Sequence, residues 1–211
     1  MTRTIEDSMK SVVKKLYFKD TFSMNDIAKY LGVSLDATVS FFRRHNIKRR
    51  NKKEASHESF QKKQASFKKR KLNTIRLKEL STIGVMLYWG EGYKGNDRLE
   101  AKGVDFANSD HKMISLFLEF LRSVYVIDEK KFRIYLYCYS DQNTNSLISF
   151  WSKITKIPKS QFTKPYIRNE YNVKSNKMTY GLIHIRYGDK KLLLEIKSMI
   201  KFYVQKYASV V

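Results

Sequence analysis

Between residues 74 and 206 the chain alternates between two hydrophobic periods, one typical of helices and one of strands. Residues 132–139 place apolar and polar side chains at alternate positions, which predicts a strand with one buried and one exposed face. Residues 113–124 repeat apolar side chains every three or four positions, as in an amphipathic helix that Ser109 or Asp110 can cap. The same patterns predict strands near 104–106, 161–168 and 180–187, and helices over 77–91, 144–156 and 190–206. This order predicts a mixed α+β domain with its helices on one face of a curved sheet.

The outer face of the predicted strands combines tyrosines with cations. Its members are Arg133, Tyr135, Tyr137, Tyr139, Lys164, Tyr166, Arg168, His184 and Arg186. The strand propensity of tyrosine alone explains the aromatic residues of a solvated sheet, but it does not explain the added arginines and lysine. Aromatic and cationic side chains on a strand face can reach base edges, phosphates and sugars in a groove, so we expect this face to bind nucleic acid.

Residues 7–50 predict three short helices. Ser23, with Asp26 three positions later, can cap the second helix, Gly32 ends it, and Ser34 can cap the third. A helix, a glycine-containing turn and another helix at this spacing resemble a helix-turn-helix DNA-binding module. A three-helix scaffold that binds protein is the alternative interpretation.

The third predicted helix should bury Leu35, Val39 and Phe42 and turn its polar side outward. A basic segment follows it directly. The side chains expected to contact DNA are Asp36, Ser40, Arg43, Arg44, Lys48, Arg49 and Arg50.

Charge favours the same partner. The chain has 42 Lys and Arg against 20 Asp and Glu, a formal net charge of +22. Such an excess is typical of proteins that bind nucleic acid. An anionic membrane is the rival partner, but the chain contains no long uncharged apolar stretch, so we expect no membrane association.

The basic excess is concentrated between residues 47 and 78, which hold thirteen Lys and Arg against two acids. This segment is interpreted as a solvated linker or a charged helix, or as an arm that follows DNA phosphates. The expected domains are a helix-turn-helix domain over 1–50, a basic linker over 51–73 and an α+β domain over 74–211.

The cellular context is predicted from cysteine and the N-terminal residues. Cys138 is the single cysteine, which excludes an intramolecular disulfide framework and suits a reducing compartment. The first residues contain no apolar signal-peptide region, so we expect a cytoplasmic, DNA-associated protein. The four histidines show no zinc-site spacing with each other or with Cys138.

An apolar run from Gly84 ends in the small-acid-small sequence of Gly90, Glu91 and Gly92, and Lys94 follows. A carboxylate at the end of a buried segment costs free energy unless a cation or hydrogen-bond donor meets it. The spacing of Gly90, Gly92 and Gly95 matches the dinucleotide fingerprint GxGxxG. That fingerprint needs a preceding strand and a following apolar helix, which this segment lacks, so no nucleotide cofactor is expected.

Read as a helix that ends in Gly90, Glu91 and Gly92, residues 84–92 resemble the signature helix of the LAGLIDADG homing endonucleases. Phe106 to Asp110, which opens the helix over 113–124, is similar to a strand-to-helix step in these domains. The resemblance implies an α+β fold with a saddle-like DNA-binding sheet. Met86 and Trp89 depart from the motif, and a helix over 144–157 departs from the usual order of elements.

The resemblance also implies chemistry. The family holds a divalent metal, Mg²⁺ or Mn²⁺, against the scissile phosphate with an acid at the position of Glu91, next to Gly92. Lys94 is the nearest candidate for the basic catalytic residue. A member with a single motif works as a homodimer, so Glu91 of two copies would meet at the site. The alternative for Glu91 is a helix-end acid that pairs with Lys94 or Arg98.

The expected function is therefore sequence-specific binding of double-stranded DNA with metal-dependent hydrolysis of phosphodiester bonds, as in a homing endonuclease of a mobile element. The alternative is a non-catalytic transcriptional regulator that has kept the fold, as some sporulation regulators have. A third, weaker interpretation is RNA binding or splicing.

Overall fold

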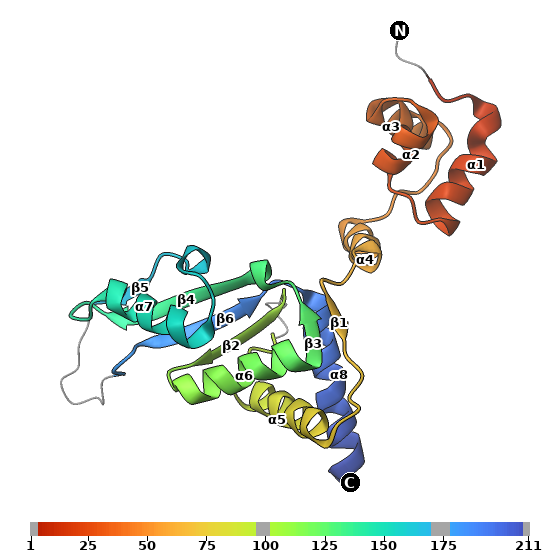
Figure 1. The fold of residues 1–211 in the computed structure, drawn as a ribbon. Coiled ribbons are helices and arrows are strands. Elements are labelled where there is room, and N and C mark those ends of the chain that lie inside the picture. Colours follow the sequence, from red (N-terminus) through yellow and green to blue (C-terminus); the bar gives the residue numbers. More distant parts are fainter. Residues whose placement is uncertain (1–3, 96–101, 170–177, 209–211) are drawn as a thin grey trace. The chain divides into compact units, whose positions relative to one another are not determined.

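The computed structural model describes residues 4–95, 102–169 and 178–208. Contacts divide the chain after Gln64 into two compact units, each with its own hydrophobic core. Figure 1 shows a helical first unit and a second unit of strands and helices. We call them the helical unit (residues 4–64) and the sheet unit (residues 65–208). Their division falls inside the segment 51–73 that was expected to be a linker.

The helical unit forms the helices that its capping residues predict. The Ser23 side chain accepts a hydrogen bond from the Asp26 backbone and the Asp26 carboxylate accepts one from Ser23, while Gly32 ends the helix at φ 63°. Ser34 caps the next helix by accepting from the Ala37 backbone. The elements are a 3₁₀ turn Asp7–Met9, α1 (Lys10–Lys14), a π-helical turn Lys15–Lys19, α2 (Met24–Leu31), α3 (Leu35–Arg44) and α4 (Lys52–Lys62).

Helix α3 buries Phe42 as predicted, but it also buries residues outside the predicted stripe. Thr38, Phe41 and Phe42 are buried, whereas Leu35 is 45% exposed. The Phe42 ring meets the buried Tyr17 ring edge-on, with 4.8 Å between the ring centroids. Two aromatic rings bury more apolar area than one leucine, so they set the orientation of the helix.

Residues 51–73 hold two elements. Asn51 caps α4 in a reciprocal arrangement with Glu54, and α4 buries none of its side chains, so this part is the charged helix. Strand β1 (Phe67–Lys69) pairs antiparallel with β3 (Tyr125–Ile127). Neither strand was predicted from the sequence, because their pairing joins residues that lie far apart along the chain.

The sheet unit confirms the mixed α+β class. Its larger sheet has the strand order β2-β6-β4-β5, with β6 antiparallel to both neighbours and β5 parallel to β4. The remaining elements are α5 (Ile75–Glu91), β2 (Val104–Asn108), α6 (His111–Val124), a 3₁₀ turn Glu129–Lys131, β4 (Phe132–Tyr139), α7 (Thr144–Thr155), a 3₁₀ turn Lys159–Gln161, β5 (Tyr166–Arg168), β6 (Leu182–Tyr187) and α8 (Lys190–Tyr207).

Strand β5 is shorter than the strand predicted over 161–168. Residues Lys159–Gln161 form a 3₁₀ turn, and Pro165 has no N–H to donate to a ladder. Lys164 therefore lies before the strand, where its side chain is exposed. Asp110 caps α6 by accepting from the Lys112 backbone, as predicted.

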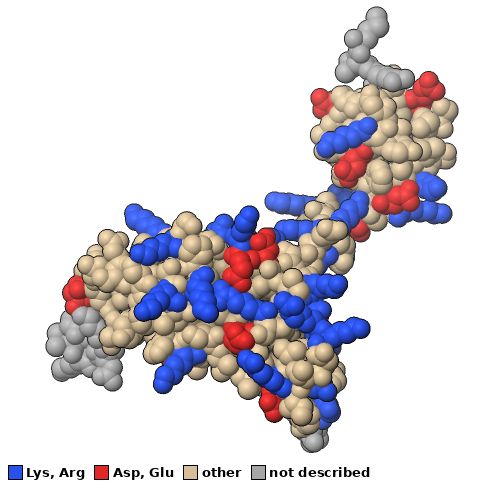
Figure 2. All heavy atoms as spheres, viewed as in Figure 1, with Lys and Arg blue, Asp and Glu red and all other residues tan. Residues whose placement is uncertain are grey.

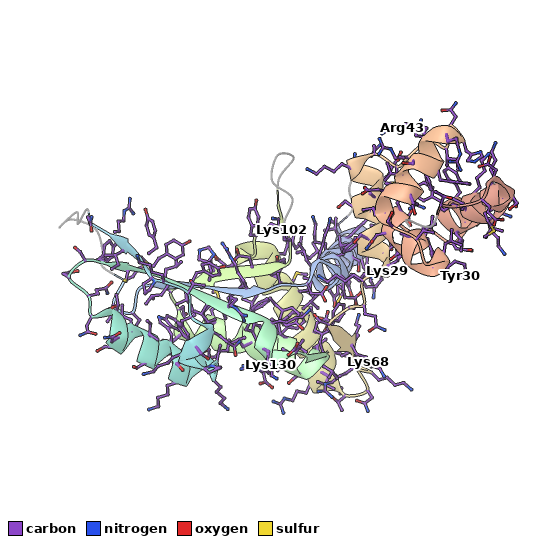
Figure 3. All side chains as sticks on the ribbon, turned by 90° about the horizontal axis from the view of Figure 1, so that it is seen from above. Lys29, Tyr30, Arg43, Lys68, Lys102 and Lys130 are labelled. Carbon is purple, nitrogen blue, oxygen red and sulfur yellow. The ribbon has the colours of Figure 1, made fainter. Side chains whose placement is uncertain are left out.

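The core of the sheet unit lies between the sheet and its helices. The inward side chains of β4, namely Phe132, Ile134, Leu136 and Cys138, are buried in the cluster that also holds apolar side chains of α5, α6, α7 and α8. Figures 1 and 3 show α6 and α7 on the same side of the strands. The other side of β4 and β6 is the side that carries the predicted DNA-contacting residues.

The sequence pattern places Leu77, Leu80, Ile83, Gly84 and Leu87 on one face of α5, and Leu80 and Gly84 of this face are buried. Gly84, Val85 and Tyr88 are buried, whereas Ile83 is 44% exposed. A Cβ atom at Gly84 would lie 2.0 Å from the ring of Phe120 on α6, so this glycine permits the close approach of the two helices. A Cβ atom at Gly90 would meet none of the described atoms within 4 Å.

Candidate nucleic-acid interface

Three strands bring the predicted tyrosines and cations onto one surface. Along β4, buried residues alternate with exposed or half-buried ones, as predicted. The register places Arg133 opposite Arg186, Tyr135 opposite His184 and Tyr137 opposite Tyr166. We call this surface the open face; it consists of Arg133, Tyr135, Tyr137, Tyr139, Tyr166, Arg168, His184 and Arg186, with Asp105 of β2 beside them.

The rings of the open face contact one another across strands. Tyr137 lies between Tyr166 and His184, with ring centroids 5.3 Å and 5.0 Å away. The guanidinium carbon of Arg186 lies 4.1 Å from the centroid of the Tyr135 ring, within cation–π range. A row of aromatic rings with a guanidinium over one of them is suited to stacking and to phosphate contacts.

Asp105 is a member of this surface that was not among the predicted site residues. Its carboxylate accepts from the Nε of Arg186 at 2.7 Å and lies 2.9 Å from the Nδ1 of His184, and its side chain is only 14% exposed. The signal was available, because the predicted alternation of Val104 and Phe106 already placed the residue between them on the outer face.

Asp105 also shifts the pKa of Arg186. Burial by itself lowers the pKa of the guanidinium, but the Asp105 carboxylate outweighs that effect and raises the pKa of Arg186 above its usual value. Arg133, directly across the strand pair, is held differently, since its NH1 group donates to the carbonyl oxygens of Lys130 and Phe132.

The end of α5 carries the predicted catalytic residues. Glu91 is the last residue of the helix and is exposed, and among the described residues its carboxylate has no hydrogen-bond or ion-pair partner. The Nζ of Lys94 donates to the carbonyl of Trp89 at 2.8 Å, so it caps the helix. Gly92 is buried and forms a β-bridge with Phe106. As a glycine it could offer a metal only its backbone carbonyl oxygen. Arg98, the other predicted partner of Glu91, lies outside the described residues.

Beside Glu91 the outward side of α5 is apolar. We call this surface the apolar strip; it consists of Ile83, Met86, Leu87 and Gly90 of α5 and Met113 of α6, and it borders a hollow of about 420 Å³. Ile83 is exposed, and Met86, Leu87 and Met113 are only partly buried. The apolar strip is therefore a candidate contact surface of the sheet unit.

The predicted residues of the helical unit separate into two groups. Asp36, Ser40, Arg43, Lys48 and Arg49 are exposed, and Figure 3 labels Arg43 near the end of α3. Two further arginines bind their own unit. Arg44 donates to Asp7 at 2.8 Å and to the Ile5 carbonyl, and Arg50 donates to the carbonyls of Tyr17 and Phe22 while its guanidinium covers the Tyr17 ring.

Figure 2 shows lysine and arginine side chains over both units, with fewer acidic side chains among them. Over the described part of the chain, no group of three or more His, Cys, Asp and Glu side chains is arranged to hold a metal ion. Within the same residues, no helix combines the length and the apolar character that a membrane span requires.

Comparison of the chain with models of protein families, with curated proteins and with solved structures finds no match. The residues themselves therefore carry the functional argument.

Proposed function

We propose that this protein binds double-stranded DNA through the open face of its sheet unit. The observation that carries the proposal is the register that aligns tyrosines and cations of three neighbouring strands on one surface. Alternating burial along β4 and β6 keeps that surface separate from the core. The net charge of +22 supplies the sequence-independent attraction to phosphates.

The helical unit is a second proposed DNA contact. The short turn after Gly32 joins α2 to α3, and the exposed side of α3 presents Asp36, Ser40 and Arg43. Lys48 and Arg49 follow in an exposed segment suited to phosphate contacts. Arg44 and Arg50 already donate to groups of their own unit, so we assign DNA contacts first to the other residues.

The proposed reaction is metal-dependent hydrolysis of DNA by a homodimer. The exposed Glu91 carboxylate suits Mg²⁺ or Mn²⁺, which take one or two carboxylates and keep several waters. One such acid per chain is insufficient for a two-metal site, and the apolar strip beside it offers a surface on which a second copy could bring its own Glu91 close. When bound, the metal would stabilise the charge that develops on the phosphate oxygens.

Glu91→Gln is the direct test of cleavage. We expect the wild-type protein to leave defined breaks in a DNA library with Mg²⁺ and none with EDTA, as read by sequencing of DNA ends. The variant should bind DNA as tightly as the wild type but cut it at least about a hundredfold more slowly, because the carboxylate that holds the metal is lost. Binding without breaks under Mg²⁺ and Mn²⁺ would instead favour the non-catalytic regulator.

Ile83→Glu tests the dimer separately. It places a charge on the exposed apolar strip without touching the core, so the monomer should remain folded. We expect sedimentation on DNA to show two copies for the wild type and for Glu91→Gln, and one copy for Ile83→Glu, which should not cut. A wild-type protein that stays monomeric on DNA at micromolar concentration would contradict the paired-acid site.

A further inference from the structure

An acid on a surface that is to meet phosphates needs an explanation. Asp105 faces outward on β2, opposite Arg186 in the strand register, and its negative charge would repel the DNA backbone. The carboxylate is nevertheless retained within a strongly basic chain, and each of its oxygens lies within hydrogen-bonding distance of a different side chain, His184 and Arg186. This arrangement indicates that Asp105 holds other groups in place.

The guanidinium of Arg186 is restrained in two directions. Its Nε donates to Asp105 at 2.7 Å, and its flat side lies over the Tyr135 ring, with 4.1 Å between the guanidinium carbon and the ring centroid. An arginine side chain loses rotational freedom about several bonds when it binds. Restraint before binding therefore lowers the entropy cost of a directed contact. With 41% of the side chain exposed, the group remains accessible from solvent.

The hydrogen bond to Asp105 uses Nε and not the two terminal amino groups. Those two groups form the fork that donates to O6 and N7 of guanine in the major groove. We propose that Arg186 reads a guanine in the DNA target and that Asp105 is the residue that positions it. This inference rests on the proposed binding of double-stranded DNA by the open face.

The contacts of Arg186 favour it over the other arginines of the open face as the residue that reads a guanine. Arg133 donates from NH1 to two backbone carbonyls, so part of its fork is already occupied. Arg168 lies at the end of the three-residue edge strand β5, where all three residues are exposed. We therefore expect Arg133 and Arg168 to contribute affinity through phosphates, and Arg186 to contribute base specificity.

Asp105→Asn separates a positioning role from an electrostatic one. The substitution removes a negative charge, so a purely electrostatic surface would bind all DNA more tightly and keep its sequence preference. A positioning residue predicts that affinity for unrelated DNA stays equal or rises while the preference for guanine falls. A residue that only supports the fold would lower both together.

The experiment uses the full-length protein and a randomised duplex library, followed by binding measurements on duplexes that differ at one base pair. The wild type should prefer guanine at one or more positions by about 5- to 150-fold over adenine, the range of a bidentate arginine contact. Arg186→Lys keeps the charge but lacks the fork, so it should lose that preference while its affinity for unrelated DNA changes less than about threefold.

Asp105→Asn should reduce the same preference by about tenfold without weakening binding to unrelated DNA. Glu119→Gln on α6 is the matched control, because it removes an acid that the open face does not contain, and it should leave the preference unchanged. Tryptophan fluorescence in urea checks that each variant is folded.

Guanine preference that survives Arg186→Lys, or that survives Asp105→Asn, would overturn this inference while leaving DNA binding intact. Binding by the wild type with no base preference would overturn it as well. Absence of any DNA binding at low salt would overturn both this inference and the proposed function.

Discussion

Arg50 of the helical unit and Arg186 of the open face are held in opposite ways. In the helical unit, Arg50 donates to backbone carbonyls and covers the Tyr17 ring, so the arginine stabilises the fold around it. On the open face, Asp105 and Tyr135 hold the guanidinium of Arg186, so the fold stabilises the position of the arginine. The same residue type is thus a structural part in one unit and a presented group in the other.

The difference follows from what each kind of element offers an arginine. The end of the π-helical turn before α2 presents carbonyl oxygens that lack partners in the helix, and a guanidinium can satisfy several of them. Most carbonyls inside a sheet pair with neighbouring strands, and Arg133 reaches a strand carbonyl only at the first residue of β4, whereas the register fixes which side chains lie opposite each other. Asp105 and Arg186 meet because β2 and β6 align them. A basic residue in a sequence therefore indicates a DNA contact only after its partners are known.

The largest expected effect is a loss of stability that is confined to the sheet unit. Gly84→Ala places a Cβ atom 2.0 Å from the buried Phe120 ring, and such overpacking should lower the free energy of unfolding of the sheet unit by about 3 kcal/mol. Both tryptophans, Trp89 and Trp151, lie in the sheet unit, so tryptophan fluorescence in urea follows that unit alone. Far-ultraviolet circular dichroism follows both units.

Gly90→Ala is the control on the same helix. A Cβ atom there meets none of the described atoms within 4 Å, so the better helix propensity of alanine should stabilise α5 by up to about 1 kcal/mol. The measurement belongs at low protein concentration, because the proposed dimer would add stability that depends on concentration. Equal losses for both variants would mean that α5 does not pack on α6 through Gly84.

A smaller effect concerns the acid that anchors the sheet unit. Asp189 accepts from the backbone and hydroxyl of Ser66 and from the backbone of Lys191. Burial by itself raises the pKa of Asp189, but these hydrogen bonds outweigh it and lower the pKa below its usual value. An aspartate whose pKa is lower in the folded state stabilises the fold at pH values above its unfolded-state pKa of about 3.9. This stabilisation is lost as the pH falls through the lower, folded-state pKa.

Asp189→Asn should therefore cost the sheet unit about 2 kcal/mol at pH 7, measured by tryptophan fluorescence in urea. The difference in free energy of unfolding between Asp189→Asn and the wild type should become smaller as the pH falls from 5 to 2. Asp26→Asn, which alters the cap of α2 in the helical unit, should leave the fluorescence transition unmoved. A shift of that transition by Asp26→Asn would show that the two units unfold together.

Two further substitutions test the comparison of the arginines directly. Arg50→Gln should destabilise the helical unit by up to about 2 kcal/mol, seen by circular dichroism and not by tryptophan fluorescence, because its carbonyl contacts are lost. Its neighbour Arg49 is exposed, so Arg49→Gln should leave both transitions unchanged. On DNA it should instead reduce the slope of log affinity against log salt by about one. If Arg50→Gln leaves the unfolding transition unchanged, Arg50 does not stabilise the helical unit and is again a candidate for DNA contact.

Local patterns in the sequence were sufficient for the class of fold and for much of the open face. Alternation over residues 132–139 separated Tyr135 and Tyr137 from the core side chains, and capping residues marked the starts of α2, α3 and α6. These features are predictable because they depend on a period of two or 3.6 residues and on hydrogen bonds between near neighbours.

Only the tertiary structure decided that Leu35 of α3 and Ile83 of α5 stay exposed, because the rings of Phe41 and Tyr88 occupy the core side of these helices. The pairing of β1 with β3 likewise joins distant segments. The sequence by itself determined that the outer face of the sheet is aromatic and basic. The strand register decided that Asp105 lies beside Arg186, because a contact between distant strands depends on how the whole sheet is assembled.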